Sequence, residues 1–350
     1  MVDKRTIDVS TGIIFRTIVI LLGIWLLYLV RGVIAIFFIA LIFAAAIDPL
    51  VVWMRRKGIP RTFAVLFIYL LLFFIIGMLV SFLVPPLVSQ FKSFTQEMPM
   101  YMEQLTKAFG GIENYFQSYS ITFSGQDFAK DLGSKIIQSS GEIFSTTVSV
   151  FTSIIAAIAI LSMTFYLSVK EEGMKKFLAL VTPPDHQDYV VSLAERIKDK
   201  IGKWLQGQLF LMLVIFVLDF VALYFLGVPY ALILAILGGV LEIIPYLGPI
   251  ISAIPGVILG FLISPLTGLL ILTAYIVIQQ FENHVIVPQV MKKAVGLNPV
   301  AVILALLIGA KLGGVPGAIL AIPLTAALSV FVGDLVKKDK TDPVASMVEN

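Results

Sequence analysis

Long apolar runs separated by short polar stretches dominate the hydrophobic pattern of this chain. A helix needs about 20 apolar residues to cross a bilayer; five runs roughly meet this length, and a sixth is sufficient if its helix is tilted. The pattern therefore predicts six membrane-spanning helices, over residues 13–30, 33–47, 63–84, 143–169, 205–226 and 266–281.

Two more apolar segments, 229–263 and 299–332, are each too long for one crossing and are broken near the middle by glycine and proline. They begin alike, with seven identical positions between 229–239 and 299–309. Each half is short for a full crossing, so each segment is predicted to be a re-entrant hairpin of two half-helices. Paired, interrupted hydrophobic segments are typical of the binding sites of secondary transporters. The breaks contain the candidate hinge residues Pro245, Gly248, Gly313, Gly314 and Pro316.

The polar stretches complete the predicted domain organisation. Apolar side chains recur at three- and four-residue steps from Leu87 to Phe116, which predicts an amphipathic helical loop outside the membrane. An apolar stripe beside lysines and arginines before residue 205 predicts a cytoplasmic helix at the headgroup boundary. The expected order is N-terminal spans (1–84), external loop (85–142), fourth span (143–169), cytoplasmic segment (170–204), transport core (205–336) and cytoplasmic tail (337–350).

Basic residues set the predicted orientation. They precede the first span, follow the second and fourth spans, and recur after residue 336, which places both termini in the cytoplasm. The two hairpins then have inverted topology. If each hairpin were instead two full crossings, the termini would lie on the same side of the membrane as before, so the charge pattern does not separate the two arrangements. The predicted fold class is thus an all-α polytopic membrane protein with about eight membrane segments. A content of 59% hydrophobic and 13% charged residues fits this class, and the net charge of +3 gives no reason to expect nucleic acid as a partner.

The sequence offers little for catalysis. It has no cysteine, two histidines, and none of the local motifs of zinc proteases, α/β-hydrolases or P-loop nucleoside triphosphatases. We therefore expect neither an enzyme nor a nucleotide-driven pump, and no metal or cofactor beyond a coupling Na⁺ or H⁺. Ionisable residues in apolar surroundings are costly, so they become the candidate functional residues.

Six polar residues of the predicted transport core are candidates for binding a substrate or an ion. One carboxylate lies a turn before Pro245, whose ring leaves backbone carbonyls free beside it. A buried acid or base alone would be costly, so pairing of that carboxylate with a lysine of the second hairpin is one alternative. For the polar group that ends the sixth span, the alternative is a solvated interfacial cluster. The candidates are Glu242, Gln280, Glu282, Asn283, Asp219 and Lys311.

Several motifs together resemble those of the autoinducer-2 exporter family. They lie at 206–208 (QGQ), 242–248 (EIIPYLG), 280–283 (QFEN), 288–289 (PQ), 297–299 (LNP) and 314–323 (GVPGAILAIP). The resemblance covers essentially the whole chain and implies an oligomeric transporter of the bacterial inner membrane. It further implies export of autoinducer-2 in some members and exchange of sodium or lithium for protons in others. The family positions that it carries over are Glu242, Pro245, Gly248, Gln280, Glu282, Pro288, Gly314 and Pro323.

Three functions are compatible with these features. We expect a secondary transporter that exports a small polar solute, with autoinducer-2 as the candidate, by alternating access in residues 205–336. The first alternative is a sodium(lithium)/proton antiporter that uses the same carboxylates. The second is a non-transporting oligomeric scaffold that assembles through its external segment. The expected partners are the lipid bilayer, a small polar solute or monovalent cation, and further copies of the chain.

Overall fold

The computed structural model describes residues 11–117, 147–291, 296 and 298–341, and in this part of the chain every regular element is a helix, with no strand. The predicted all-α class is therefore confirmed for these residues. The helices, in chain order, are α1 (Thr11–Leu29), α2 (Arg31–Arg56), α3 (Arg61–Gln117), α5 (Thr147–Val169), α6 (Glu171–Val181), the 3-10 turn η1 (Pro184–His186), α7 (Gln187–Phe225), α8 (Ala231–Leu241), α9 (Leu247–Ile263), α10 (Pro265–Phe281), the π-helical turn η2 (Glu282–Ile286), α11 (Val287–Met291) and α12 (Pro299–Thr341).

Several helices have the length and composition of membrane spans. Four shorter apolar stretches lie at the positions of the first and fourth predicted spans and of the first hairpin: Phe15–Leu29 in α1, Ile155–Val169 in α5, and the helices α8 and α9. A multi-pass membrane chain is confirmed, whereas six crossings plus two re-entrant hairpins stay a prediction. In the described residues, the five stretches that are long and apolar enough to cross a membrane are Arg31–Arg56, Arg61–Phe94, Pro184–Phe225, Pro265–Met291 and Val300–Asp334.

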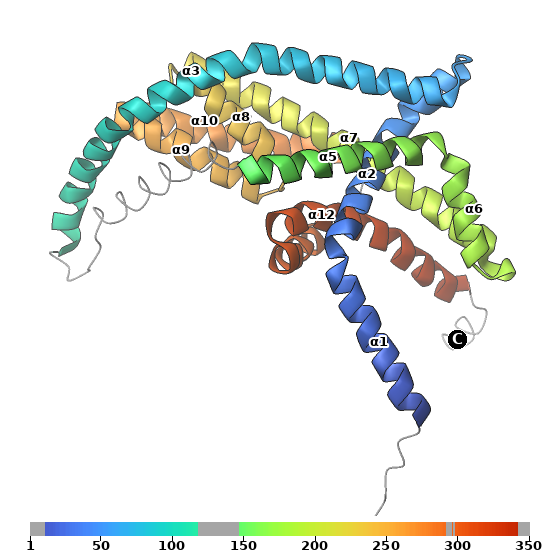
Figure 1. Cartoon of the computed structure of the whole chain (residues 1–350). Helices are drawn as coiled ribbons and strands as arrows, with labels where there is room; N and C mark the ends of the chain where they lie inside the picture. Colours follow the sequence, from blue (N-terminus) through green and yellow to red (C-terminus); the bar gives the residue numbers. More distant parts are fainter. Residues whose placement is uncertain (1–10, 118–146, 292–295, 297, 342–350) are drawn as a thin grey trace, which may run out of the picture.

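α3 extends far beyond the third predicted span. It is one helix of 57 residues that continues through Pro85, Pro86 and Pro99. At 1.5 Å per residue its path is about 85 Å, whereas the hydrocarbon core of a bilayer is about 30 Å thick. Figure 1 shows α3 arching past α8 and α10 and extending beyond them. The predicted external loop therefore begins as a direct continuation of a span, and its residues 118–146 lie outside the described part.

A polar contact attaches α3 to the start of the first hairpin. The Tyr230 hydroxyl donates a hydrogen bond to the Glu97 carboxylate (2.6 Å), and the Tyr101 hydroxyl donates to the same oxygen (3.1 Å). Phe94 packs edge-on against the Tyr230 ring, with ring centroids 5.3 Å apart. Phe94, a member of the predicted apolar stripe of α3, therefore packs against another part of the same chain.

The second half of the predicted cytoplasmic segment, 170–204, is part of a longer helix. α7 continues without a break from Gln187 through Phe225, so this half and the fifth predicted span form one element. Ile201 and Trp204, which we expected at lipid headgroups, are 0% and 2% exposed. They pack against α2 and α12, because these helices cover the apolar stripe that the prediction assigned to lipid.

The first hairpin is formed by α8 and α9, joined by residues 242–246. Pro245 lies in this break, and Tyr246 has a left-handed φ of 66°, which is unusual for a residue other than glycine. A Cβ atom on Gly248 would overlap the backbone carbonyl of Leu241, so a glycine is required where the two limbs meet. The predicted break of the first hairpin is thus present at the predicted residues.

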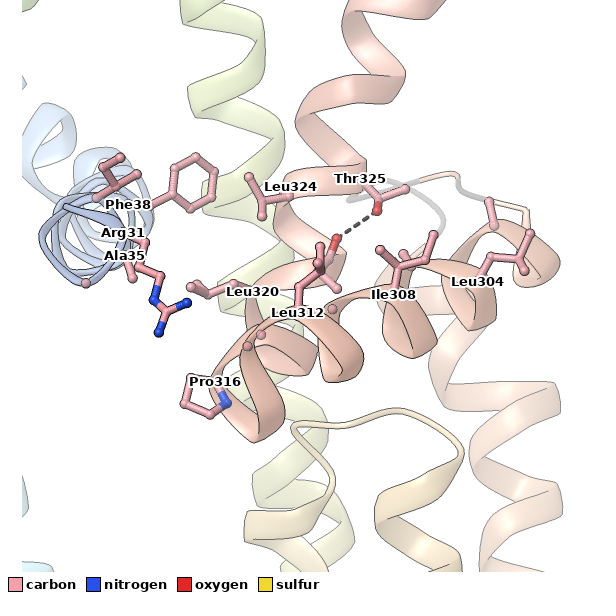
Figure 2. A pocket seen from close by; sticks show the side chains of 18 residues that line it. Arg31, Ala35, Phe38, Leu304, Ile308, Leu312, Pro316, Leu320, Leu324 and Thr325 are labelled. Carbon is pink, nitrogen blue, oxygen red and sulfur yellow. Dashed lines mark hydrogen bonds between the residues drawn. The ribbon is translucent and has the colours of Figure 1, made fainter. Parts of the chain in front are cut away.

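The second hairpin lies within α12, which bends sharply at Gly314 (φ 62°, ψ −145°). This backbone conformation is accessible mainly to glycine. Figure 2 shows the chain turning back at Pro316, so that the limb with Leu320 and Leu324 lies beside the limb with Leu304 and Ile308. The limbs approach closely at Gly309 and Gly317, where each glycine faces the backbone of the other.

Two buried clusters share α7 as their common helix. One joins α2, α7 and α12, and the other joins α3, α7, α8, α9 and α10. The second hairpin therefore packs on α7 near Ile201, whereas the first hairpin and α10 pack on α7 near Leu223. The clusters are centred on fully buried side chains that include Ile201, Ala326, Leu223 and Ile271.

The close approach of the two limbs of α12 makes a prediction about stability. In Gly309→Ala the new Cβ would lie 2.8 Å from the Ala321 Cβ and would overlap the Gly317 carbonyl, so the limbs must separate. Such overpacking costs about 1–3 kcal/mol. We expect a lower melting temperature for the purified protein in detergent. Gly313→Ala is the matched control, because a Cβ there meets nothing within 4 Å; equal melting temperatures for the two variants would contradict the hairpin packing.

Candidate functional site

Three carboxyl groups from different helices are buried together beside α7. Asp219 lies on α7, Glu242 directly follows α8, and Glu282 begins the π-helical turn after α10. Their exposed fractions are 2%, 2% and 3%. Each carboxyl group interacts electrostatically with at least one of the others. We call these three residues the carboxyl cluster.

Asp219 fits into the cluster because the neighbouring helix α8 has no side chain at the point of contact. Gly238 of α8 faces the Asp219 carboxyl group, and a Cβ on Gly238 would overlap the Asp219 Oδ2. A close approach of this kind is a usual reason for a glycine within a helix. The pair therefore sets the distance between α7 and α8 at the depth of the cluster.

Glu242 is held by the break in the first hairpin. Because the α8 helix ends here, the Glu242 carbonyl has no helical partner and instead accepts a hydrogen bond from the Gln208 side-chain amide (2.7 Å). Gln208 is 1% exposed, and its Oε1 has no partner in the described structure. The Glu242 Oε2 is also buried without a hydrogen-bond partner in the described structure. Glu242 thus combines a fixed backbone with a carboxyl oxygen that is free to take a ligand.

Glu282 is positioned by the π-helical turn. π-helical turns are rare and occur frequently at functional sites. The Gln279 side-chain amide donates to the Glu282 Oε2 (2.9 Å), and the His284 ring contacts the Gln280 carbonyl (2.9 Å) on the exposed side. The wider turn therefore directs Glu282 inward while His284 stays at the surface.

The electrostatics of the cluster require a positive charge or protons. Glu242 and Glu282 are close enough to share a hydrogen bond, which needs a proton on one of the two carboxyl groups. Two like charges about 4 Å apart repel by about 4 kcal/mol at an effective dielectric constant of 20. Among the described residues, no lysine, arginine or histidine forms an ion pair with the cluster. A proton or a bound cation is therefore the species that would stabilise it.

Asp48 shows the opposite arrangement and serves as an internal comparison. Its two carboxylate oxygens pair with Arg61 (2.6 Å) and Lys198 (2.9 Å), which links α2, α3 and α7. Two cations balance this one acid, so Asp48 fits a structural role, as a boundary residue of the second span. The carboxyl cluster has no such balance in the described part of the chain.

A cavity of about 430 Å³ lies beside the cluster, between α7, α9 and α10. We call it the side cavity. Most of its lining is apolar, but Asp219, Ser252, Tyr275 and Gln279 contribute polar groups. The Tyr275 hydroxyl is buried and has no hydrogen-bond partner in the described structure. No three acidic or histidine side chains of the described residues converge with metal-ligand geometry, so a cation here would also need neutral oxygen ligands.

A larger groove of about 1000 Å³ lies between α2 and the two limbs of α12. Figure 2 shows its apolar side chains, with Arg31 near one end, Leu304 near the other and Thr325 between them. The Thr325 hydroxyl donates to the Ala321 carbonyl (2.7 Å), and the Arg31 guanidinium lies 4.1 Å from the centre of the Tyr28 ring. The groove therefore offers no acidic ligand to a cation or proton.

The structure brings together only part of the predicted site. Asp219, Glu242 and Glu282 meet, whereas the other three candidates lie on the outside of the fold. Lys311 is exposed and forms no ion pair with Glu242. Gln280 and Asn283 point away from the carboxyl cluster, because they lie on other faces of the helical segment that carries Glu282. The exposed candidates are Gln280, Asn283 and Lys311.

Four polar residues outside the six candidates line the site: Gln208, Ser252, Tyr275 and Gln279. Gln208 belongs to the 206–208 motif, and Gln279 to the polar group that ends the sixth predicted span. Helical spacing would have placed two of them, Gln279 and Gln208, beside the carboxyl groups. Gln279 lies three residues before Glu282, which places both on one face, whereas Gln280 at two residues does not share it. Gln208 and Asp219 are eleven residues apart, which is three helical turns on α7. Ser252 and Tyr275 carried no comparable signal.

Comparisons with known proteins place the chain in a family. A family model described as "AI-2E family transporter" matches residues 14–337. YrrI and YueF of Bacillus subtilis, each named "Putative transport protein", are 30% and 28% identical to the chain; the alignments cover 81% and 86% of this chain and 81% and 84% of the relatives. A protein of Halobacillus andaensis named "Sodium-lithium/proton antiporter" is 25% identical, over 87% of this chain and 91% of the relative. The protein therefore belongs to the AI-2E family, a family of transporters and not of enzymes.

Proposed function

We propose that this protein exchanges a monovalent cation for protons across the membrane, with Glu242 and Glu282 as the shared binding site. The observation that carries the proposal is the buried pair of carboxyl groups, which has no basic partner among the described residues. A pair of this kind can hold a proton or a cation, but charge repulsion and confined space disfavour holding both. Mutually exclusive occupancy is the requirement for exchange.

Two further features support the proposal. The helix ends at Glu242 and the backbone becomes irregular at Tyr246; irregular backbone at membrane depth is tolerated where it is covered by protein or lines a cavity. Such breaks also permit a helix to change direction, as alternating access requires. In addition, one relative is named as a sodium-lithium/proton antiporter. As part of this proposal, both termini are cytoplasmic in a bacterial inner membrane, and the coupling ions are H⁺ and Na⁺ or Li⁺.

A second candidate function is export of a small polar solute such as autoinducer-2. It is favoured by the side cavity, whose volume of about 430 Å³ lies in the range of small-ligand sites. The same carboxyl cluster would then couple solute movement to protons. The scaffold alternative has less support, because Gly256, Gly309 and Gly317 face neighbours within the chain and Phe94 packs on Tyr230. Assembly with further copies stays a prediction.

The role of Glu242 predicts the loss of exchange in Glu242→Gln. The amide keeps the size of the side chain but cannot release a proton or supply a charge. We expect purified protein in proteoliposomes with an imposed pH gradient to show Na⁺-dependent or Li⁺-dependent change of internal pH, and Glu242→Gln to show only the background of empty vesicles. Glu172→Gln is the control, since the Glu172 side chain on α6 is 84% exposed. Normal exchange by folded Glu242→Gln would remove this residue from the mechanism.

Adding autoinducer-2 to the same vesicles separates the two candidate functions. Exchange that needs no organic solute supports the antiporter. If proton movement begins only after the furanone is added, the exporter is supported and the antiporter is contradicted. No change of internal pH under any imposed gradient, with or without autoinducer-2, would contradict both functions.

A shared site also predicts competition between protons and the cation. Lowering the pH on the side of cation binding should raise the apparent KM for Na⁺, by up to about tenfold for each pH unit if one proton competes. The maximal rate should change little, because saturating Na⁺ displaces the proton. Initial rates of exchange across a series of Na⁺ concentrations and pH values would measure both constants. A constant KM with a falling maximal rate would indicate separate sites.

A further inference from the structure

The side cavity opens at the surface of the fold, since lining residues such as Ile250 and Ile254 are exposed, and it reaches inward to the buried Asp219. Its walls come from α7, α9 and α10, and most of its lining side chains are isoleucine, valine, leucine or proline. Four polar residues interrupt this surface, and three of them come from three different helices: Asp219, Ser252 and Tyr275. Sites for small ligands typically combine an apolar wall with a few convergent polar groups.

The polar groups of the side cavity retain oxygen atoms that can accept a cation. Among the described residues, none forms a hydrogen bond with the Asp219 carboxyl group, and Asp219 is only 2% exposed. The Tyr275 hydroxyl is buried without a partner. Ser252 uses its hydroxyl proton to bond the Pro249 carbonyl (3.0 Å), which leaves its oxygen as an acceptor. Gln279 uses its amide nitrogen to bond Glu282, so its amide oxygen is not engaged by that bond.

We propose that the side cavity is a water-containing chamber that binds a monovalent cation before the cation reaches Glu242 and Glu282. Asp219 supplies the negative charge, and the oxygens of Ser252, Tyr275 and Gln279 act as neutral ligands. Gln279 connects the chamber to the shared site, because it lines the side cavity and also bonds Glu282. This inference rests on the proposed cation exchange and adds to it the route and the first ligand.

The size of the side cavity determines in what form the cation would bind. A water molecule occupies about 30 Å³ in the liquid, so a cavity of about 430 Å³ is much larger than a bare ion. The cation would therefore keep part of its hydration shell in the chamber. A carboxylate in a confined, low-dielectric cleft raises the local concentration of cations and excludes anions.

Gly256 sets the position of the Tyr275 hydroxyl. It faces Tyr275 from α9, and a Cβ on Gly256 would lie 2.7 Å from the hydroxyl oxygen. A methyl group at this position would displace the tyrosine ring. Gly256 therefore keeps the Tyr275 hydroxyl at the boundary of the chamber.

The absence of cysteine from the chain makes a direct labelling test possible, since any introduced thiol is the only one. Ser252→Cys places a thiol in the side cavity with little change of size. The purified full-length protein in liposomes is treated with one of two methanethiosulfonate reagents. One carries a cationic trimethylammonium-ethyl group, and the other carries an anionic sulfonatoethyl group. Labelling requires water, because the thiolate is the reacting form. Thr273→Cys is the matched control, as Thr273 lies on an exposed face of the apolar helix α10.

We expect Ser252→Cys to react with the cationic reagent about tenfold faster than with the anionic one. Na⁺ or Li⁺ should slow this reaction relative to choline at equal ionic strength. Asp219→Asn in the same background should remove both the charge preference and the protection. Thr273→Cys should be unreactive.

Two outcomes would overturn the proposal. No reaction at Ser252→Cys means that the side cavity is dry or filled with lipid. A reaction at equal rates for both reagents, without protection by Na⁺, means that water enters but no cation binds. Ala253→Cys, at another lining position on α9, repeats the test if Ser252→Cys does not fold.

The labelling test and the exchange assay can fail independently. Labelling measures water and cation access and does not require turnover. A dry side cavity in a protein that still exchanges cations for protons would contradict the chamber and leave the proposed function intact. A protected, cation-selective chamber in a protein without exchange would contradict the proposed function alone.

Discussion

A carboxyl group in an apolar interior must be balanced by a proton, a cation or hydrogen bonds, and three such groups lie buried among the helices of this protein. Asp219, Glu242 and Glu282 come from three separate elements, so the cluster is complete only when α7, the first hairpin and the end of α10 lie together. Several local features follow from this requirement. Gly238 makes room for Asp219, and the π-helical turn orients Glu282. Asp48, which two basic residues balance, needed none of these adaptations.

The two hairpins share a sequence pattern but have different surroundings. In the first hairpin, the break leaves a carbonyl free at Glu242, and Gln208 of α7 satisfies it. In the second, the break at Gly314 carries no acid, and the limbs pack on each other through Gly309 and Gly317. The second hairpin also contributes Leu306 and Ile322 to the cluster that holds α2 and α7. One copy of the duplicated segment therefore has a break that carries a buried acid, whereas the other copy has a break without an acid and packs against α2 and α7, although the sequence suggested two equivalent halves.

The sequence predicted those parts of the fold that depend on local pattern. Apolar runs marked most of the helices, and Pro245, Gly248 and Gly314 marked the breaks, because backbone geometry restricts which residues can be used there. Burial of an apolar stripe against other helices could not be predicted in the same way. The stripe with Ile201 and Trp204 suits a lipid surface or a protein surface equally well, and only the positions of α2 and α12 decide between them. Lys311 shows the same limit, since its exposure depends on what covers the second hairpin.

The carboxyl cluster bears differently on the two transport functions. A neutral solute needs no negative charge at its site, so an exporter of such a solute would use Glu242 and Glu282 to carry protons and the side cavity to carry the solute. A cation exchanger would use both for the same ion in succession. Proton coupling is thus common to both functions, and what separates them is the occupant of the side cavity. Asp219 decides this point physically, because its carboxyl group lines the side cavity and is itself part of the cluster. When this acid is ionised, it favours a cation over a neutral molecule, and on this ground we propose exchange ahead of export.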